Sequence, residues 1–400
     1  MNQTLGLTAL GIANSLGVGK PKVAEALFQG SRAGLRPRAD LIPGRTVHVG
    51  AIEADLPDLS PKLAPFASRN NRLAQLVLNE IEAEIDAAIA HFGRDRIAVV
   101  IGTSTSGIAD GETAFAFHAA HGVWPQGYDY RLQETGSLAE FVARSLGLTG
   151  PAYTIATACS SSGKALAAAA RLIRAGFADA ALVGGVDSLC KMTVQGFAAL
   201  EALSHGLCNP FSRNRDGINI GEAAVVFLLA PQPATVRLAG TGETSDAYHV
   251  SAPDPTGKGA ASAMAVALRG AGLNPADIAY LNLHGTATPL NDAMEGRAVH
   301  AIFGGATPCS STKALTGHTL GAAGACEAAF LWLTLNTRYN PENRLPPHIF
   351  DGEADPDIPP LNLVAPGTKL TPSGCRVAAM STSFAFGGSN IAIALERAAS

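Results

Sequence analysis

Short apolar runs bounded by glycine recur along the 400 residues of the chain. Four of them have the length and composition of buried strands, and they occupy residues 4–11, 96–104, 178–188 and 223–230. Between the runs lie helical patterns such as residues 72–93, where apolar residues recur at i, i+3 and i+4 and Gly93 marks the end. The alternation of strands and helices predicts an α/β fold with a mostly parallel sheet.

The second part of the sequence repeats the first in outline. AYLNLHGTAT, which starts at Ala279, is similar to IAVVIGTSTS, and TGHTLGAAGACEAA around His318 is similar to TACSSSGKALAAA around Cys159. Such echoes predict an internal duplication in which Cys159 and His318 hold equivalent places ahead of alanine-rich helices. The two prolines in PQPATV predict a joint, so the expected halves are residues 1–232, with Cys159, and residues 233–400, with His284 and His318.

The composition excludes several classes of function. Apolar residues make up 47% of the chain and charged residues 16%, with 43 glycines, which is typical of a soluble α/β protein. The net charge of −4 and the scattered basic residues argue against nucleic acid or a polybasic membrane anchor, and leave small or acidic carrier partners open. The N-terminus lacks a basic region before an apolar core, and no apolar stretch reaches ~18 residues, so we expect a cytoplasmic protein without a membrane span.

Six cysteines lie far apart without any CxxC pair, which favours reduced thiols over a zinc knuckle or a disulfide framework. Cys159 stands where a strand should end and a helix begin. A helix N-terminus presents free N–H groups and the positive end of a dipole, and this placement can lower a thiol pKa from ~8.5 to roughly 3.5–7.5. A packing role among the alanines is the alternative interpretation of this cysteine.

Two histidines and two charged residues are further candidates for a site. His284 follows a predicted strand, at the end of the sheet where α/β sites gather, and His318 lies between glycine and small residues that permit close approach. Lys313 and Glu327 flank His318 and could form a buried ion pair that orients its imidazole, with exposed charges as the alternative. Structural histidines remain the alternative for both imidazoles.

The C-terminal stretch SFAFGGSN, residues 383–390, places two phenylalanines beside a diglycine turn that could direct backbone N–H groups at an oxyanion. Together with TACSSS, PFSRNRDGINIGEAA, HGTATPLND and KALTGHTLGAAGACEA, it makes a chain-long pattern that resembles the elongating β-ketoacyl-acyl carrier protein synthases. The resemblance implies a thiolase-like fold, in which duplicated βαβαβαββ halves form five αβαβα layers. It also implies an acyltransferase of fatty acid or polyketide and polyene synthesis.

The resemblance assigns roles to residues of this chain. Cys159 corresponds to the acyl acceptor, and His284 and His318 to the pair that serves malonyl decarboxylation. The remaining implied positions are the supporting charges Lys313 and Glu327, the pantetheine-bordering Thr286 and Thr288, Phe384 with the gating Phe386, and the structural acidic pair Asp292 and Glu295. The N–H groups of Cys159 and Phe386 would form an oxyanion hole.

The implied chemistry agrees with these residue types, because cysteine is both a nucleophile and a leaving group and neutral imidazoles can stabilise an enolate. It requires no metal or redox cofactor. The implied partners are acyl carrier protein, with acyl and malonyl groups, and a second subunit, which is either a copy of the chain or a related ketosynthase-like protein.

Two departures from the family pattern and several rival functions remain. Ala385 stands between the two phenylalanines where the family usually has glycine, which could restrict the gate. Residues 102–122 differ from the common housekeeping forms and favour a specialised pathway.

A thiolase would need a second catalytic cysteine in a Cys-x-Gly turn, but Cys375 is followed by Arg376. A chain-length-factor subunit usually lacks the nucleophile, a starter-condensing relative would need Asn in place of His318, and a papain-like hydrolase would need a Cys-His-Asn site.

Overall fold

The computed structural model describes residues 4–371 and 376–398, so Cys375 lies outside the described part. The strands are β1 (Leu5–Asn14), β2 (Gly17–Val18), β3 (Leu35–Ile42), β4 (Arg45–Gly50), β5 (Ile97–Gly102), β6 (Ala152–Ile155), β7 (Ala180–Asp187), β8 (Ile220–Gly221), β9 (Ala223–Ala230), β10 (Val236–Ser245), β11 (Ile278–Asn282), β12 (Pro308–Ser310), β13 (Asn362–Leu363), β14 (Val377–Phe384) and β15 (Ser389–Arg397). The α-helices are α1 (Lys20–Gln29), α2 (Arg69–Asn79), α3 (Glu82–Phe92), α4 (Ile108–His121), α5 (Ser137–Leu146), α6 (Ser161–Arg174), α7 (Lys191–Ala199), α8 (Lys258–Ala271), α9 (Pro289–Phe303), α10 (Lys313–Thr316) and α11 (Ala323–Leu335).

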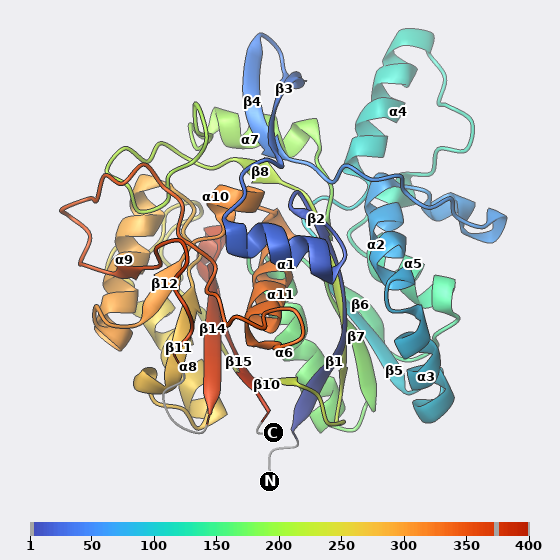
Figure 1. The fold of residues 1–400 in the computed structure, drawn as a ribbon. Coiled ribbons are helices and arrows are strands. Elements are labelled where there is room, and N and C mark those ends of the chain that lie inside the picture. The colour runs from blue at the N-terminus through green and yellow to red at the C-terminus, as the bar shows by residue number, and fades with distance from the viewer. Residues whose placement is uncertain (1–3, 372–375, 399–400) are drawn as a thin grey trace.

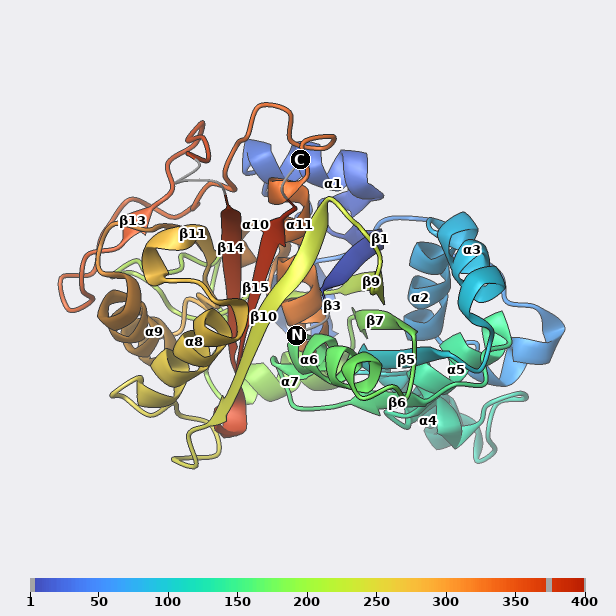
Figure 2. The ribbon, with the colours of Figure 1, turned by 90° about the horizontal axis from the view of Figure 1, so that it is seen from below.

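Five layers build the molecule (Figures 1 and 2). A sheet with the strand order β13-β12-β11-β14-β15-β10-β1-β9-β7-β5-β6 folds around the central helices α6 and α11, so that one part of the sheet lies on each side of them. Helices α8 and α9 cover one outer face, and α2, α3 and α5 cover the other (Figure 2). This arrangement is the predicted αβαβα order, with α6 and α11 buried between the layers.

The hydrophobic core follows these layers. One cluster joins α6 and α11 to the inner faces of both parts of the sheet, a second lies beneath α2, α3 and α5, and a third lies beneath α8 and α9. Every residue of α11 is buried, which explains why its sequence is apolar apart from Glu327 and Thr334. The two central helices therefore hold the loops that precede them, around Cys159 and His318, in fixed positions.

All four apolar runs form strands as predicted, namely β1, β5, β7 and β9. The prediction of a mostly parallel sheet is wrong, because β1–β9, β7–β9, β1–β10, β10–β15 and β14–β15 are antiparallel. Among the described strands of this sheet, the parallel ladders are β5–β6, β5–β7, β11–β12, β11–β14 and β12–β13. A parallel pair needs a crossover that returns the chain, whereas only a single 3-10 turn, Phe386–Gly388, lies between β14 and β15.

The helical stretch of residues 72–93 also differs in detail from its pattern. It belongs to two helices, α2 and α3, with a break at Glu80 and Ile81, although Gly93 ends the second helix as predicted. The first three residues of α2 precede the apolar pattern, because Ser68 caps the helix by accepting a hydrogen bond from the Asn71 N–H. In the described part of the chain, none of the helices combines the length and the apolar character that a bilayer span requires.

Candidate active site

Cys159 lies in a tight turn between β6 and α6, as the sequence predicts. The preceding residue, Ala158, has a φ of 52°, a left-handed conformation that is unusual for a residue other than glycine. Hydrogen bonds hold this turn: the Ser161 hydroxyl bonds to the Ala158 carbonyl at 2.6 Å, and the Ser160 hydroxyl bonds to the Thr157 carbonyl at 2.7 Å. The strained turn directs the buried Cys159 thiol into the interior, toward residues of the C-terminal half.

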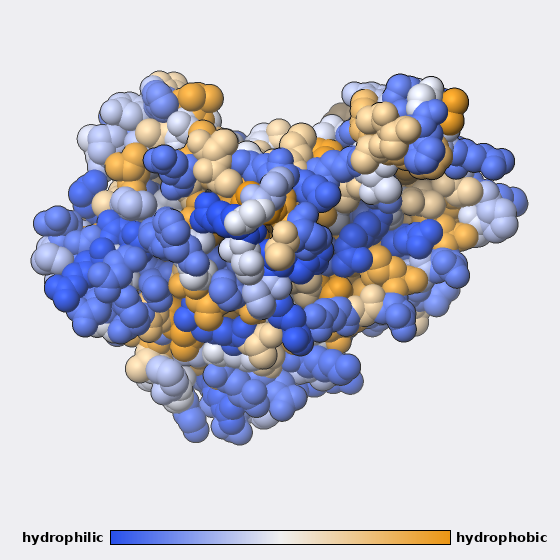
Figure 3. Space-filling model, turned by 90° about the horizontal axis from the view of Figure 1, so that it is seen from above, coloured by the Kyte–Doolittle hydropathy of each residue, from blue (hydrophilic) through white to orange (hydrophobic). Residues whose placement is uncertain are grey.

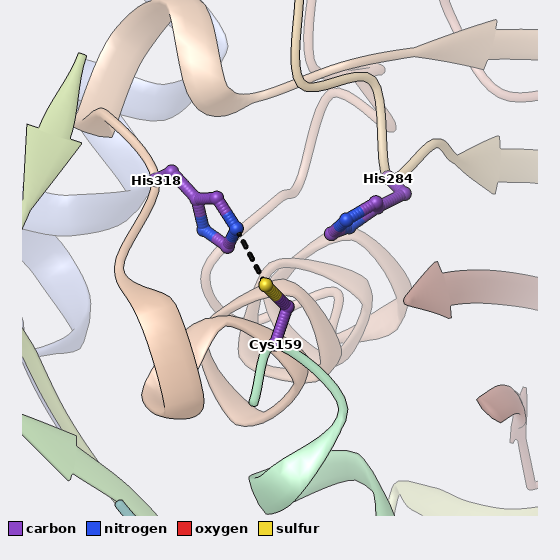
Figure 4. A group of neighbouring side chains, drawn as sticks. All are labelled: Cys159, His284 and His318. Atoms are coloured by element: carbon purple, nitrogen blue, oxygen red, sulfur yellow. Dashed lines mark hydrogen bonds between the residues drawn. The ribbon is translucent and has the colours of Figure 1, made fainter. Parts of the chain in front are cut away.

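His318 reaches the same point from the loop before α11. Its Nε2 lies 3.0 Å from the Cys159 Sγ (Figure 4). On the other side of the ring, the backbone N–H of Leu320 donates to Nδ1 at 3.2 Å. Leu320 itself has a φ of 52°, so a second strained residue sets the orientation of a side chain in this site.

His284 enters from the end of β11, and its ring lies almost perpendicular to that of His318, with centroids 5.4 Å apart. Its backbone N–H donates to Glu295 Oε1 at 2.7 Å. Its Nδ1 lies 3.3 Å from the Nζ of Lys313, whose ammonium group can only donate a hydrogen bond. The potential ligand atoms of Cys159, His284 and His318 all lie within 4.8 Å of one another.

The contacts at Nδ1 determine the proton positions on both imidazoles. Because each Nδ1 accepts a hydrogen bond, the ring proton of each neutral histidine belongs on Nε2. Burial lowers the pKa of both His284 and His318 well below the usual value, and the nearby Lys313 lowers it further, so both rings are neutral near pH 7. The site thus contains two neutral N–H donors beside the cysteine sulfur.

Lys313 and Glu327 form the buried ion pair that the sequence predicts. The prediction that this pair orients His318 is wrong, because the Lys313 ammonium contacts the ring and carbonyl of His284 instead. His284 lies 29 residues away in sequence, and the pairing of β11 with β12 brings the two residues together. Burial raises the pKa of Glu327 to about 7, although Lys313 opposes this shift.

The expectation of a lowered thiol pKa at Cys159 is also wrong for this structure. Burial raises the pKa of Cys159 to about 11, since the loss of water outweighs the favourable effects of Lys313 and of nearby N–H groups. Among those groups are the backbone N–H groups of Cys159 and Phe386, which both face the sulfur. They match the oxyanion hole that the family resemblance implies.

Phe384 and Phe386 form one wall of the chamber around the sulfur, and Ala385 connects them. The Phe384 ring packs edge-on against His284, with centroids 6.2 Å apart. The Phe386 ring packs against Phe197 of α7 at 5.9 Å. Ala385 adopts an extended conformation with φ −89° and ψ 154°, which any residue can adopt, so the alanine does not strain the loop in this state.

A small chamber of about 20 Å³ surrounds the sulfur, and a wider groove of about 260 Å³ lies outside it. The chamber is lined by Cys159, both histidines, Thr286 and Thr288, and by the two phenylalanines. Thr288, Asn291, Phe384 and Phe386 border both spaces. The phenylalanine wall therefore separates the sulfur from a groove that reaches the surface.

Asp292 and Glu295, both on α9, stabilise the loop that carries His284. Glu295 accepts hydrogen bonds from the N–H groups of His284 and Gly285, each at 2.7 Å. Asp292 accepts from the N–H groups of Phe211 and Ala287 at 2.8 and 3.2 Å. Neither carboxylate lines the chamber around the sulfur, so their observed contacts are structural, as the resemblance implies.

The structure contains one set of possible metal-ligating atoms and several buried oxygen atoms that lack a partner among the described residues. The Cys159, His284 and His318 atoms have the spacing of a metal site, but the Lys313 ammonium beside His284 opposes a bound cation there. Asn282 Oδ1, Glu327 Oε2 and Ser381 Oγ are buried oxygen atoms that have no hydrogen-bond partner among the described residues. A buried water molecule can satisfy an oxygen atom of this kind.

Sequence reasoning missed several residues of the site, among them Ile218 and Asn291, which line the chamber. Ala158 and Leu320 have backbone conformations that alanine and leucine do not signal, and Phe197 comes from α7, which has no recognisable motif. The repeat gave a partial signal for Leu320, because it follows His318 by two residues, as Ser161 follows Cys159.

The architecture places the protein in a class, that of the thiolase-like proteins. A solved structure of a ketosynthase in complex with its chain length factor from Xenorhabdus doucetiae superposes with a TM-score of 0.92. The sequences are 45% identical, and the match covers 99% of this chain and 98% of the other. A β-ketoacyl synthase from Burkholderia phymatum superposes with a TM-score of 0.86 at 26% identity, over 99% of this chain and 100% of that one.

Within this class, the chain belongs to the β-ketoacyl synthase family. Residues 28–234 match the N-terminal domain of the family and residues 235–345 match its C-terminal domain. The 3-oxoacyl-[acyl-carrier-protein] synthase 2 of Staphylococcus aureus strain COL is 36% identical over 277 residues, which cover 64% of each chain. The match thus spans less than two thirds of that relative.

Proposed function

We propose that the chain is a β-ketoacyl-acyl carrier protein synthase that extends an acyl chain by decarboxylative condensation with malonyl-acyl carrier protein. The observation that carries the proposal is the His318 Nε2–H beside the buried Cys159 sulfur, with the His284 ring nitrogen within 4.8 Å of both and with each Nδ1 accepting from a donor. Membership in the β-ketoacyl synthase family supports the same reaction in fatty acid or polyketide synthesis.

The first half-reaction transfers the acyl group from the carrier to Cys159. The sulfur attacks the thioester carbonyl, and the carrier thiol leaves with the proton that the cysteine gives up. With a thiol pKa of about 11 in the closed, dry site, the thiolate needs the His318 N–H and the backbone N–H groups around the sulfur as it forms. The N–H groups of Cys159 and Phe386 stabilise the oxyanion of the tetrahedral intermediate.

In the second half-reaction the Nε2–H groups of His284 and His318 bind the thioester oxygen of the malonyl group. They stabilise the enolate that forms as carbon dioxide leaves, and neutral donors suit this task since they need no proton transfer. The enolate carbon then attacks the acyl group on Cys159 and the cysteine sulfur leaves. Thr286 and Thr288 border the path of the pantetheine arm, and Phe384 and Phe386 form its gate.

The proposed assembly is a dimer, with a second copy of the chain or with a related ketosynthase-like subunit. The edge strand β6 ends the large sheet and pairs only with β5 among the described strands, so its outer edge can accept another strand. Helix α4 projects from the body of the molecule (Figure 1), and Phe115, Phe117 and Trp124 on this helix and the loop after it are exposed. The lobe at the upper right of Figure 3 carries hydrophobic residues among hydrophilic ones. Solved relatives include ketosynthase–chain length factor complexes, which supports a heteromeric partner.

We also propose that residues 1–232 and 233–400 act as two thiolase-like halves. The two family domains meet at residues 234 and 235, close to the predicted joint. A chain-length-factor role is less well supported, because Cys159 and both imidazoles are present and their sulfur and ring nitrogen atoms lie within 4.8 Å of one another. A thiolase role is not supported either, because the sequence lacks the second cysteine motif that a thiolase needs.

The test is a reaction of the full chain with malonyl-carrier protein and a panel of acyl-carrier primers, followed by intact mass spectrometry of the carrier. We expect a carrier-bound β-ketoacyl product that is two carbons longer than the primer. If Cys159 is never acylated and no extended product forms with any primer, alone or with a ketosynthase-like partner, the proposal is wrong.

A further inference from the structure

The orientation of His318 depends on a short turn that follows it in the chain. Residues Leu320–Ala322 form a single 3-10 turn, and α11 begins at the next residue. The first residue of the turn, Leu320, has a left-handed φ of 52° and donates its N–H to the His318 Nδ1 at 3.2 Å. Because this conformation is unfavourable for leucine, other groups must hold the turn in place. Those groups determine which ring nitrogen of His318 carries the proton.

Asp187, the last residue of β7, supports this turn from the N-terminal half of the molecule. Its side chain is fully buried, and its Oδ2 accepts a hydrogen bond from the Ala322 N–H at 2.9 Å. The same N–H donates to the Thr319 carbonyl at 3.0 Å, so the carboxylate adds a second acceptor to a bond within the turn. A carboxylate at the start of α11 is favourable, because the N-terminus is the positive end of the helix dipole.

The other oxygen of Asp187 anchors the carboxylate. Its Oδ1 accepts hydrogen bonds of 2.7–2.8 Å from the loop after β5, and the donors are the Thr103 hydroxyl, the Ser104 N–H and both the N–H and the hydroxyl of Thr105. Each of the two hydroxyls also accepts from a backbone N–H at 3.1 Å, that of Ser106 or that of Ser188. Their own hydrogen atoms are therefore directed at Asp187. Because these neighbours are donors, the ionised carboxylate fits the position, although burial raises the pKa of Asp187.

The turn lies directly against the Asp187 carboxylate. A Cβ atom at Gly321 would lie 2.9 Å from the Asp187 Oδ2 and 2.7 Å from the Ser104 Oγ, so a larger residue would force the turn to move. Asp187 does not itself line the chamber around the Cys159 sulfur. It can therefore influence chemistry at the sulfur through the backbone that it holds.

We propose that Asp187 is a positioning residue for His318. By holding the turn, Asp187 keeps the Leu320 N–H on the His318 Nδ1. The ring proton then stays on Nε2, which lies 3.0 Å from the Cys159 sulfur. The position of this proton follows from the contacts alone. Its effect on condensation rests on the proposed function, in which the same N–H donates to the sulfur and to the enolate.

Asp187→Asn tests the proposal, because it replaces one acceptor with a donor at nearly constant shape. The amide oxygen can keep the donors of the loop after β5, but the NH₂ group then meets the Ala322 N–H, donor against donor. The reverse orientation is worse, since the NH₂ group would face every donor of that loop. The turn should therefore shift and withdraw the Leu320 N–H from His318.

The direct measurement is the protonation of the His318 ring in the full chain labelled with ¹⁵N-histidine. Two-bond ¹H–¹⁵N spectra show which ring nitrogen carries the proton, and the His318 signals are identified by their loss in His318→Ala. We expect the Nε2–H form alone in the wild type and an additional Nδ1–H form in Asp187→Asn. The kcat of condensation should fall roughly tenfold to a hundredfold, as for a misplaced catalytic group, with the KM for malonyl-carrier protein nearly unchanged.

A second variant and a matched control separate this effect from a loss of stability. Gly321→Ala disturbs the same contact from the other side, because its methyl group pushes the turn away from Asp187, so it should give the same Nδ1–H signal. The control is Ser162→Ala. The Ser162 hydroxyl accepts from the Ala325 N–H at 2.8 Å, which is also at the start of α11 but outside the turn. This control should lower the melting temperature and leave His318 in the Nε2–H form.

The proposal is wrong if Asp187→Asn and Gly321→Ala both keep the single Nε2–H form and the wild-type kcat. An Nδ1–H signal in Ser162→Ala would also overturn it, since any loosening of α11 would then have the same effect. If Asp187→Asn does not fold, Gly321→Ala decides by the same criterion. The spectra need no substrate, so a wild type that does not condense malonyl groups would refute the proposed function and leave the test of Asp187 intact.

Discussion

The two halves of the molecule place different chemistry at equivalent points. In the N-terminal half, Cys159 precedes α6 and meets backbone N–H groups, whereas in the C-terminal half His318 precedes α11 and meets His284 from the end of β11. Both loops contain a left-handed residue, Ala158 in one and Leu320 in the other. In this duplicated fold, one half therefore carries the nucleophile and the other half carries the donors that would stabilise an enolate. The two half-reactions should respond to different substitutions.

The largest effect is expected in the N-terminal half. Cys159→Ala should lower acylation by acyl-carrier protein at least about a thousandfold, because no other group can form the thioester. Cys309→Ala is the matched control, since this buried thiol lies in the core beneath α8 and α9 and should affect stability only. Peptide mapping of the acyl adduct measures the outcome, and an adduct on Cys159→Ala at the normal rate would remove the nucleophile assignment.

The next effect belongs to the C-terminal half and should leave the first intact. His284→Ala should still accept an acyl group on Cys159, whereas release of carbon dioxide from malonyl-carrier protein should fall roughly a hundredfold to a thousandfold, as for the loss of an oxyanion donor. Single-turnover assays on the acylated variant separate the two steps. Carbon dioxide release at the wild-type rate would assign His284 a structural role only. It would also contradict the assignment of the two half-reactions to different halves of the molecule.

The sequence predicts the fold well where it repeats itself. The echo between the segments around Cys159 and His318 predicts two equivalent alanine-rich helices, and the family resemblance implies the layers between which these helices pack. It could not show that more than half of the ladders between the described strands of the large sheet are antiparallel, because strand direction depends on which connections lack a returning helix, as between β14 and β15.

The site was predictable in its residue types and less so in its contacts. Lys313 is five residues from His318 in sequence, but the adjacent strands β11 and β12 place its ammonium beside His284 instead. The thiol pKa of Cys159 was predicted in the wrong direction, because placement at a helix N-terminus can be read from the sequence and the loss of water around the sulfur cannot.

A smaller, pH-dependent effect should sharpen the role of the ion pair behind His284. Because burial raises the pKa of Glu327 to about 7, its carboxyl is protonated below pH 7 and ionised above it. Only the ionised form holds the Lys313 ammonium by charge, so condensation should increase as pH rises through about 7. In Glu327→Gln the rate of condensation should no longer rise through pH 7. Above pH 7 this variant should be roughly tenfold slower than the wild type, which is less than the ~100-fold loss that a 1 Å misplacement can cause.

The control for this profile is Glu396→Gln, which removes a buried carboxylate paired with Arg237 and Arg376 at the end of β15. A general loss of stability would affect both variants, whereas only Glu327→Gln should change the pH profile of condensation. If the limb near pH 7 persists in Glu327→Gln, another group titrates there and the ion pair acts only as a structural contact.

The smallest effect concerns Ala385, where the chain departs from the Gly of its family's closing motif. Its φ of −89° and ψ of 154° are open to alanine, so Ala385→Gly should change the rate of Cys159 acylation by less than about twofold. Stability should fall by about 0.4–1 kcal/mol, because glycine increases the entropy of the unfolded chain. Rapid-quench acylation with a panel of primers measures the first quantity, and urea unfolding measures the second.

A matched variant lies two residues away. Gly387 has a φ of 81° with open space around its Cα, so Gly387→Ala introduces backbone strain without a steric clash. If acylation of Cys159 depends only on the closed conformation of this loop, Gly387→Ala should change the acylation rate more than Ala385→Gly does. Faster loading or a wider range of primers in Ala385→Gly would show that the open gate needs a conformation at residue 385 that alanine resists. The gate, rather than the buried chamber behind it, would then set which acyl chains reach Cys159.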